Sequence, residues 1–411
     1  MRTFLFTLLF LVGVQTTLAQ KEGKALIDSL YTALPGMKED TGMVRLLAAI
    51  NFEMRIVNPR EGLKPGLTAL HSSGKLNYLY GEGLSHYSLG INYAYMSRFP
   101  ESVDQLLKAQ VIFEKLKDYN LICATYLGLA LSYRDLDSTI SFKYLLKAKE
   151  IMPQSTVSVW KVRNTGNIGN IYRSLNHLDS AGKYLSLQLK LSKDYHLNYE
   201  MMLAKNRFGW LYLKRNNLDS AFIFLKTGLD YFKSIGANYL VAENSAILGH
   251  ILVRIYLADG SHKNQVLREA KVYAEEALQA AQEIGMIEVS DASVVLSDIY
   301  KIEGNSAKAL DYLQQSYKYK DSILGLKIVN KATFLNWKYE QELKDKQVEV
   351  LELRNRQQFT LIIATGIIAV ILVIVVLFII SSRKKLKKAY NLVNQQKDEI
   401  TRVLGELKLQ T

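Results

Sequence analysis

The sequence of 411 residues contains a single cysteine, Cys123, and this excludes a disulfide bond within the chain. Its immediate neighbours are apolar, so we expect a small, inert core residue rather than a reactive thiol. Patterns typical of metal sites are also missing. There is no cysteine pair and no His-x-x-x-His spacing, and the six histidines are scattered along the chain. No metal and no cofactor is therefore expected.

Charged residues are absent from Phe359 to Ile380, a run of 22 residues. At ~1.5 Å per residue, a helix of this length covers about 33 Å, which is enough to cross a hydrocarbon layer of ~30 Å. Five of the six residues from Arg383 to Lys388 are basic, and basic residues concentrate on the cytoplasmic side of a span. These features predict a membrane helix at 359–380 and a cytoplasmic tail at 381–411.

The first 19 residues have the three parts of a secretory signal. Arg2 precedes an apolar stretch from Phe4 to Val14, and small and polar residues lead to a cleavage site after Ala19. The alternative, a second membrane helix, is disfavoured because this apolar part has only about 11 residues. We predict a signal peptide at 1–19, an exported region from residue 20 to residue 358, and location in the inner (cytoplasmic) membrane.

The formal net charge of +13 does not predict a nucleic-acid partner. Most of the basic residues lie in the predicted exported region, and they are scattered rather than gathered in one segment.

Between residues 20 and 324 one pattern recurs with glycine-to-glycine spacings of 38, 41, 40 and 40 residues. Each copy has an apolar-Gly pair, an aromatic or aliphatic residue three positions later and, in several copies, an alanine about twelve positions later. Glycine inside a helix costs ~1 kcal/mol relative to alanine, so we expect a second helix to pack closely over it, with the alanine as the matching small residue. The expected structural residues are Gly90, Gly128, Gly169, Tyr172, Ala181, Gly209, Tyr212, Ala221, Gly249 and Ala309.

Turns between the two helices of a copy carry Asp-Ser pairs at Asp137, Asp179 and Asp219. Aspartate and serine accept hydrogen bonds from the free amides that begin a helix, so these pairs predict N-caps of the second helices.

The glycine and alanine positions resemble those of tetratricopeptide repeats. This resemblance implies an all-α solenoid of about seven helical hairpins, near residues 43–76, 83–117, 121–152, 162–195, 202–236, 242–285 and 290–323. In the sixth hairpin Ala270 and Ala277 lie too far from Gly249 for the common register, and residues 257–266 are expected to form a longer turn.

Stacked hairpins leave a concave face lined by their first helices, and this face is the default binding surface of such arrays. Positions next to the glycine motif are expected to point into it, and their amides, arginines and tryptophan suit an extended peptide or protein ligand. These candidate groove residues are Asn170, Arg173, Asn206, Trp210, His250 and Arg254.

From residue 325 to residue 358 the sequence predicts a long charged stalk helix. No proline or glycine interrupts it after Gly325. In the tail, Leu386, Val393, Ile400 and Leu407 repeat every seven residues, which is typical of a coiled coil. A homodimer through stalk and tail follows. The alternative is a single amphipathic helix on the inner leaflet.

The whole arrangement, from Met1 to about Gly405, resembles a bacterial family of membrane sensors with tetratricopeptide repeats. The resemblance implies a signalling role and a cytoplasmic kinase or regulator as partner. In this sequence no histidine and no glycine-rich nucleotide site follows residue 380, and about 30 residues cannot bury a core of their own. We therefore expect a non-catalytic sensor or scaffold. The alternatives are the input half of a truncated or split sensor histidine kinase, and a tether for envelope assembly.

Overall fold

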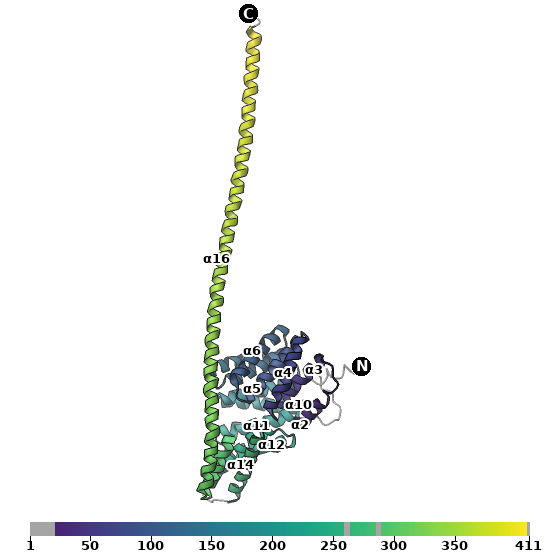
Figure 1. Ribbon diagram of the computed structural model, residues 1–411, viewed down its shortest axis with the longest axis vertical. Helices are drawn as coiled ribbons and strands as arrows, with labels where there is room; N and C mark the ends of the chain where they lie inside the picture. The colour runs from purple at the N-terminus through teal and green to yellow at the C-terminus, as the bar shows by residue number, and fades with distance from the viewer. Residues whose placement is uncertain (1–20, 259–263, 285–288, 409–411) are drawn as a thin grey trace. The chain divides into compact units, whose positions relative to one another are not determined.

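The computed structural model describes residues 21–258, 264–284 and 289–408, and within these ranges the chain is helical without a strand. The predicted signal peptide lies outside the described residues. The chain divides into two compact units, one ending at Phe334 and the other beginning at Leu335. Figure 1 shows the stacked helices of the first unit and the long helix α16.

Consecutive helices of the first unit pair as hairpins, and this confirms the predicted all-α repeat solenoid. The pairs are α3 (Thr41–Met54) with α4 (Pro59–Lys75), α5 (Leu79–Tyr95) with α6 (Phe99–Leu116), α7 (Tyr119–Tyr133) with α8 (Ser138–Ile151), α9 (Ser158–Ser174) with α10 (Leu178–Asp194), α11 (Asn198–Lys214) with α12 (Leu218–Ser234), and α13 (Asn238–Ala258) with α14 (Asn264–Ile284). Helix α15 (Val289–Ile302) pairs with the start of α16 (Ser306–Lys408) through the Ser297–Ala309 hydrogen bond and the stacked rings of Tyr300 and Tyr312. A short 3-10 helix, η1 (Met152–Gln154), follows α8.

The helix starts differ in part from the prediction. Asp137 caps α8, because its Oδ1 accepts from the amides of Thr139 (3.0 Å) and Ile140 (3.2 Å). At α12 the cap is Asn217, whose Oδ1 accepts from the Ser220 amide at 3.0 Å. Asp179 and Asp219 lie instead in the first turns of α10 and α12, where a negative charge interacts favourably with the helix dipole. The prediction that these two residues cap their helices was therefore wrong.

Most repeat glycines lie where the second helix crosses the first; Gly128 instead lies against Leu106 and Ile91 of the preceding hairpin. A Cβ on Gly209 would be 2.6 Å from Cγ of Leu225, and one on Gly169 would be 2.9 Å from Cδ2 of Leu185. The closest neighbour is thus a leucine four residues after the expected alanine. Ala181 and Ala221 are nevertheless fully buried in the same hairpins.

The sixth hairpin is longer than the others, since α13 and α14 each have 21 residues. A Cβ on Gly249 would lie 3.1 Å from the carbonyl oxygen of Ala270, and both Ala270 and Ala277 are fully buried. The added length therefore explains why the alanines of this hairpin depart from the common spacing. Residues 259–263 of the expected longer turn lie outside the described residues.

An additional helix, α2 (Gly23–Thr32), precedes the first hairpin and was not predicted. It brings the start of the array against later hairpins: the Lys24 amide donates to the Ile235 carbonyl at 2.9 Å. Nearby, the Tyr239 amide donates to the Ile56 carbonyl at 3.1 Å. The array therefore curls until its first hairpin contacts α12 and α13.

Helix α16 makes a similar long-range contact before residue 334. The side-chain amide of Asn330 donates to the Ser97 carbonyl at 2.7 Å across 233 residues of sequence, and Lys331 donates to the Leu136 carbonyl. The buried ring of Phe334 packs edge-on against Tyr133, with centroids 5.6 Å apart. Residues 330–334, which we call the base of α16, thus lie across the turns that follow α5 and α7.

Among the described residues, two helices are long and apolar enough to cross a membrane, and they differ in burial. Helix α13 is mostly buried in the array, as expected for a core helix. The second lies within residues 346–405 of α16, and none of it is buried; Phe378, for example, is 71% exposed. The exposed apolar segment is the candidate membrane span.

Candidate functional site

The inner face of the array has two parts that share helices α9 and α11. We call them the closed half, built around Arg163 and Glu200, and the open half, built around Arg173 and Arg207. Both halves carry arginine and tryptophan, but their charges are arranged differently.

In the closed half each arginine has an acidic partner. Nε of Arg163 donates to Oε1 of Glu200 at 2.6 Å, and the Glu200 side chain is only 3% exposed. Nη1 of Arg55 lies 3.2 Å from Oε2 of Glu53, and both side chains are largely buried. Burial opposes the charged form of Arg163, but the carboxylates of Glu200 and Glu53 outweigh it and raise its pKa. The pKa of Arg55 is raised by the same balance, chiefly through Glu53.

Aromatic rings fill the space around these ion pairs. The centroid of the Phe52 ring lies 5.8 Å from that of Tyr87 and 6.4 Å from that of Trp160. The guanidinium of Arg55 lies 3.9 Å from the Phe52 centroid. Across the curl of the array, Tyr95 and Tyr239 meet edge-on at 5.0 Å. Contacts between the first and later hairpins therefore occupy this half of the inner face.

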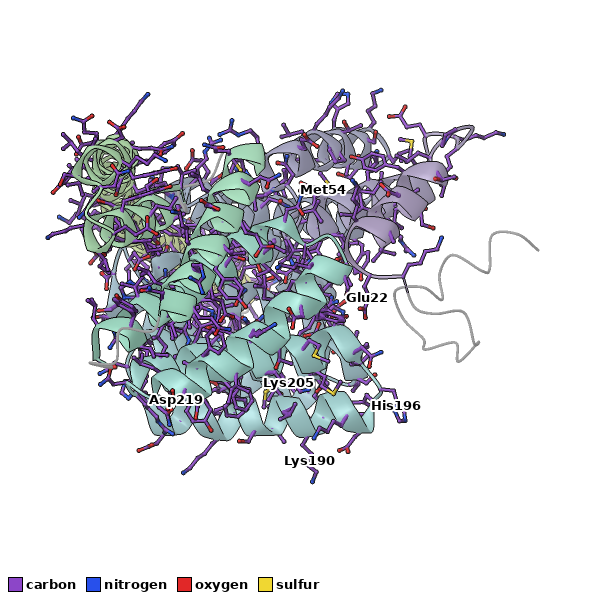
Figure 2. All side chains as sticks on the ribbon, turned by 90° about the horizontal axis from the view of Figure 1, so that it is seen from below. Glu22, Met54, Lys190, His196, Lys205 and Asp219 are labelled. Atoms are coloured by element: carbon purple, nitrogen blue, oxygen red, sulfur yellow. The ribbon has the colours of Figure 1, made fainter. Side chains whose placement is uncertain are left out.

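Glu22, which is labelled in Figure 2, closes the edge of this cluster. Its Oε1 accepts from the Tyr199 amide at 3.3 Å, and its Oε2 accepts from the Tyr231 hydroxyl. Burial raises its pKa. The Tyr199 hydrogen bond opposes this rise, and the nearby charges of Glu200 and Glu53 add to it.

In the open half the arginines have only amide partners. Arg173 donates to Oδ1 of Asn170 through Nε (3.2 Å) and Nη2 (2.8 Å). Arg207 donates to Oε1 of Gln188 (3.0 Å) and to Oδ1 of Asn167 (2.6 Å). Among the described residues neither guanidinium forms an ion pair. Both residues are partly exposed, and the Arg207 guanidinium packs against the fully buried Gln188 and over Gly166.

The electrostatics of the open half reflect this lack of counter-charge. Burial lowers the pKa of Arg173 to about 10; Glu243 opposes the change, and Arg134 and Arg207 add to it. Burial also lowers the pKa of Arg207, and the nearby charge of Glu200 opposes the change. The indole of Trp210 lies 5.5 Å from the Arg173 guanidinium and offers a flat surface beside it. This half of the inner face therefore carries excess positive charge.

The predicted groove residues are placed in three different settings. Asn170, Arg173 and Trp210 come together in the open half. Asn206 is buried between helices, where it packs over Gly228 and its amide donates to Asn244.

His250 and Arg254 lie apart from these residues on α13. His250 is an exposed residue, but partial burial of its ring lowers its pKa. Arg254 adds to that effect, and Asp298 and Asp291 oppose it. Arg254 donates to Oδ1 of Asn216 at 2.6 Å, in the turn after α11.

Arg207 was missed by the sequence analysis. It lies 40 residues after Asn167, to which it donates, and both stand two positions before a repeat glycine. Comparing equivalent positions of successive repeats would have identified this pair.

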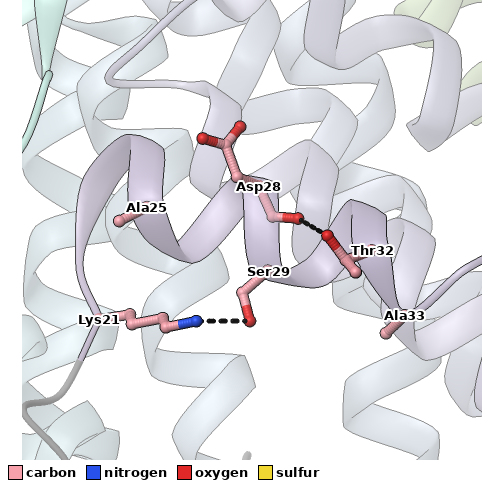
Figure 3. Close-up of a pocket in the computed structure, with 6 residues that line it drawn as sticks. All are labelled: Lys21, Ala25, Asp28, Ser29, Thr32 and Ala33. Atoms are coloured by element: carbon pink, nitrogen blue, oxygen red, sulfur yellow. Dashed lines mark hydrogen bonds between the residues drawn. The ribbon is translucent and has the colours of Figure 1, made fainter.

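Two surface hollows lie elsewhere on the described residues. One, of about 480 Å³, is lined by α2 residues and Lys21 (Figure 3). Another, of about 460 Å³, lies at the turn between α11 and α12 beside the end of α13. Neither includes Arg173 or Arg207. Among the described residues no group of acidic, histidine or cysteine side chains could hold a metal ion.

Comparison with known proteins shows likeness of structure only. No family model matches the chain, and no curated protein matches it. Among solved structures, the apo form of RapI is 18% identical, with a TM-score of 0.44 over 65% of this chain and 94% of that one. A Rap protein complexed with competence and sporulation factor is 15% identical, with a TM-score of 0.49 over 75% and 93%. The apo quorum sensor NprR from B. thuringiensis is 17% identical, with a TM-score of 0.42 over 73% and 80%. These similarities concern the helical-repeat fold alone.

Proposed function

We propose that the chain is a non-catalytic, membrane-anchored repeat protein that binds a protein or peptide on its inner face and acts as a sensor or scaffold. The observation that carries this proposal is the continuity of α16. Its first turns complete the last hairpin, residues 330–334 contact the turns after α5 and α7, and the same helix contains the exposed apolar segment at 359–380. Exposed apolar side chains over this length suit lipid far better than water.

The same continuity supports a relay function. Helix α16 is held at two places, by α15 in the last hairpin and by the turns after α5 and α7. It should therefore shift when the curvature of the array changes, because packed interfaces move between discrete arrangements. Pairing of two chains through the stalk and the heptads of the tail would carry such a shift to a cytoplasmic kinase or regulator. A simple tether needs the anchor but no such shift.

The topology is tested by alkaline phosphatase fusions to the full chain. A fusion after Glu340 should be active and one after Gly405 inactive, because we place residues 20–358 in the periplasm and 381–411 in the cytoplasm. Carbonate extraction should leave the protein in the membrane fraction. Inactivity after Glu340, or release by carbonate, would contradict the anchored arrangement.

The relay is tested by single cysteines in a Cys123→Ser background. Val393→Cys should cross-link between chains, and Gln395→Cys, away from the seam, should serve as the matched control. A second variant, Ser97→Cys with Asn330→Cys, should lock the base of α16 to the array. The relay predicts that ligand changes the yield of Val393→Cys cross-linking in the unlocked chain and not in the locked one. If ligand leaves this yield unchanged in both, α16 anchors the array without relaying, and the tether is the better description.

A further inference from the structure

The last hairpin of the array exposes an apolar stripe on α16. Its members Leu310, Leu313, Tyr317 and Ile328 are between 37% and 61% exposed. At 3.6 residues per turn these four lie within an arc of about 60°, and no charged residue shares that arc between Leu310 and Ile328. Among the described residues the second helices α6, α8, α10 and α12 each expose only one or two large apolar side chains. Single exposed apolar residues are normal, but a stripe of them indicates a contact surface.

The described part of the array leaves this stripe uncovered. Each earlier second helix packs against the first helix of the next hairpin. No such helix follows the last hairpin among the described residues, because α16 continues unbroken to Lys408. The side of α16 that meets the array is a different one, on which Ser316, Asn330 and Phe334 are buried. The end of a repeat array needs a polar outer face or a cover, so the stripe points to a partner outside this chain.

We propose that a second copy of this chain covers the stripe with the same residues of its own α16, so that two arrays touch at their last hairpins. The pairing rests on the proposed membrane anchor, which makes α16 of both copies run in the same direction. It extends the expected pairing of stalk and tail into the repeat array itself. A symmetric dimer uses one self-complementary patch on both copies, and an apolar stripe meets that requirement. Anchoring in one membrane also raises the effective concentration of the second copy.

The charges beside the stripe fit a parallel pair of helices. Lys320 and Asp321 are both exposed, and they lie on opposite borders of the stripe at nearly the same height. In a symmetric parallel pair, the left border of one helix faces the right border of the other, so each Lys320 meets Asp321 of the other copy. An antiparallel pair brings like borders together and loses this match. Such flanking charges set the partner and the orientation of paired helices.

The stripe is tested by single cysteines in the full-length Cys123→Ser chain, oxidised in native membranes. Leu310→Cys and Ile328→Cys should each give a disulfide-linked product of twice the mass of the chain. The matched controls are Asp311→Cys and Val329→Cys, which are exposed neighbours one residue further along the helix. They point about 100° away from the stripe positions and should give at least about fivefold less product.

The orientation is tested by mixing two differently tagged chains, one with Leu310→Cys and one with Ile328→Cys. They should not cross-link with each other, because these positions are ~27 Å apart in a parallel pair. Lys320→Asp or Asp321→Lys alone should lower the Ile328→Cys yield at least about twofold by placing like charges together, and the double variant should restore it. Circular dichroism confirms that each variant is folded.

Equal yields at stripe and control positions would overturn the inference. So would a mixed product of the two tagged chains, a cross-linked product of another mass, or no recovery in the charge-swapped double variant. Val393→Cys in the same membranes separates this failure from failure of the proposed function. If Val393→Cys cross-links while the stripe positions do not, the chains pair through the tail alone and the relay stands. If neither cross-links, the dimeric relay fails together with the stripe.

Discussion

The closed and open halves of the inner face use the same residue types on the same two helices, but they balance charge differently. On α9, Arg163 has a carboxylate within 2.6 Å, whereas Arg173, ten residues later, has only the amide of Asn170. The pKa of the first is raised and that of the second is lowered. Two arginines of the same helix therefore differ in role: Arg163 is part of the packed structure of the closed half, and Arg173 in the open half is available for a ligand.

The difference arises from where the array closes. The curl brings Phe52 and Glu53 of α3, and Arg55 just after it, against the first turns of α9 and α11. It also brings Glu22 against Tyr199. Acidic groups therefore gather in the closed half: Glu22, Glu53 and Glu200 stand against Arg55 and Arg163. In the open half Glu243 is the nearby acid for Arg134 and Arg173, whereas the nearby acid for Arg207 is Glu200 of the closed half.

The largest effect is expected from Arg163→Met. It leaves the buried carboxylate of Glu200 without its counter-charge, and loss of one partner of a buried ion pair costs ~3 to 5 kcal/mol. Urea unfolding of the full chain in detergent, followed by circular dichroism, measures this loss. The matched control is the double variant Arg163→Met with Glu200→Leu, which removes both charges and should recover most of the stability. A single-variant loss below about 1 kcal/mol would show that the pair does not hold the closed half together.

The two tryptophans provide a second comparison. Trp160 is 8% exposed and touches Phe52 and Tyr87, so Trp160→Ala should cost ~3 to 5 kcal/mol by creating a cavity. Trp210 is partly exposed beside Arg173, so Trp210→Ala should cost less than half as much but weaken peptide binding. Equal losses of stability in the same urea experiment would mean that both halves are packed alike.

A smaller effect on stability is expected from Arg173→Met. The guanidinium is partly desolvated and has no ion-pair partner among the described residues, so its removal should change the free energy of unfolding by less than about 1 kcal/mol. A decrease similar to that of Arg163→Met would show that the arginine is structural and would remove the distinction between the halves.

The sequence predicted the fold well because the repeat is local. The glycines at 90, 169, 209 and 249 mark crossings within single hairpins, and Gly128 packs against the hairpin just before it, so neither curvature nor long-range contacts are needed to recognise them. Helix α2 carries no repeat glycine, and its position depends on contacts with Ile235 and Tyr199, so no local pattern indicated it.

The candidate site was less predictable for the same reason. Asn170, Arg173 and Trp210 follow from their positions next to the glycines. The distinction between Arg163 and Arg173 does not, because it depends on which acids the curl brings near. Asn206 looked equivalent to its neighbours, but it lies three positions before Gly209, on the side of α11 that faces Gly228 of α12.

The smallest predicted effect tests the surplus of acids in the closed half. Burial, opposed by the Tyr199 hydrogen bond and reinforced by Glu200 and Glu53, raises the pKa of Glu22 above its ordinary value of 4.5. A carboxyl whose pKa is raised on folding stabilises the fold below the unfolded pKa, and that contribution is lost as pH rises through the folded pKa. Glu22→Gln keeps the neutral form at every pH, so it should be slightly more stable than the wild type at pH 7, by less than about 1 kcal/mol, with the difference shrinking toward pH 4. Asp179→Asn, at an exposed carboxylate on α10, is the control and should not reproduce this pH dependence. If Glu22→Gln is instead less stable at pH 7, the charged carboxylate of Glu22 stabilises the edge of the closed half, and the acids there are in balance rather than in excess.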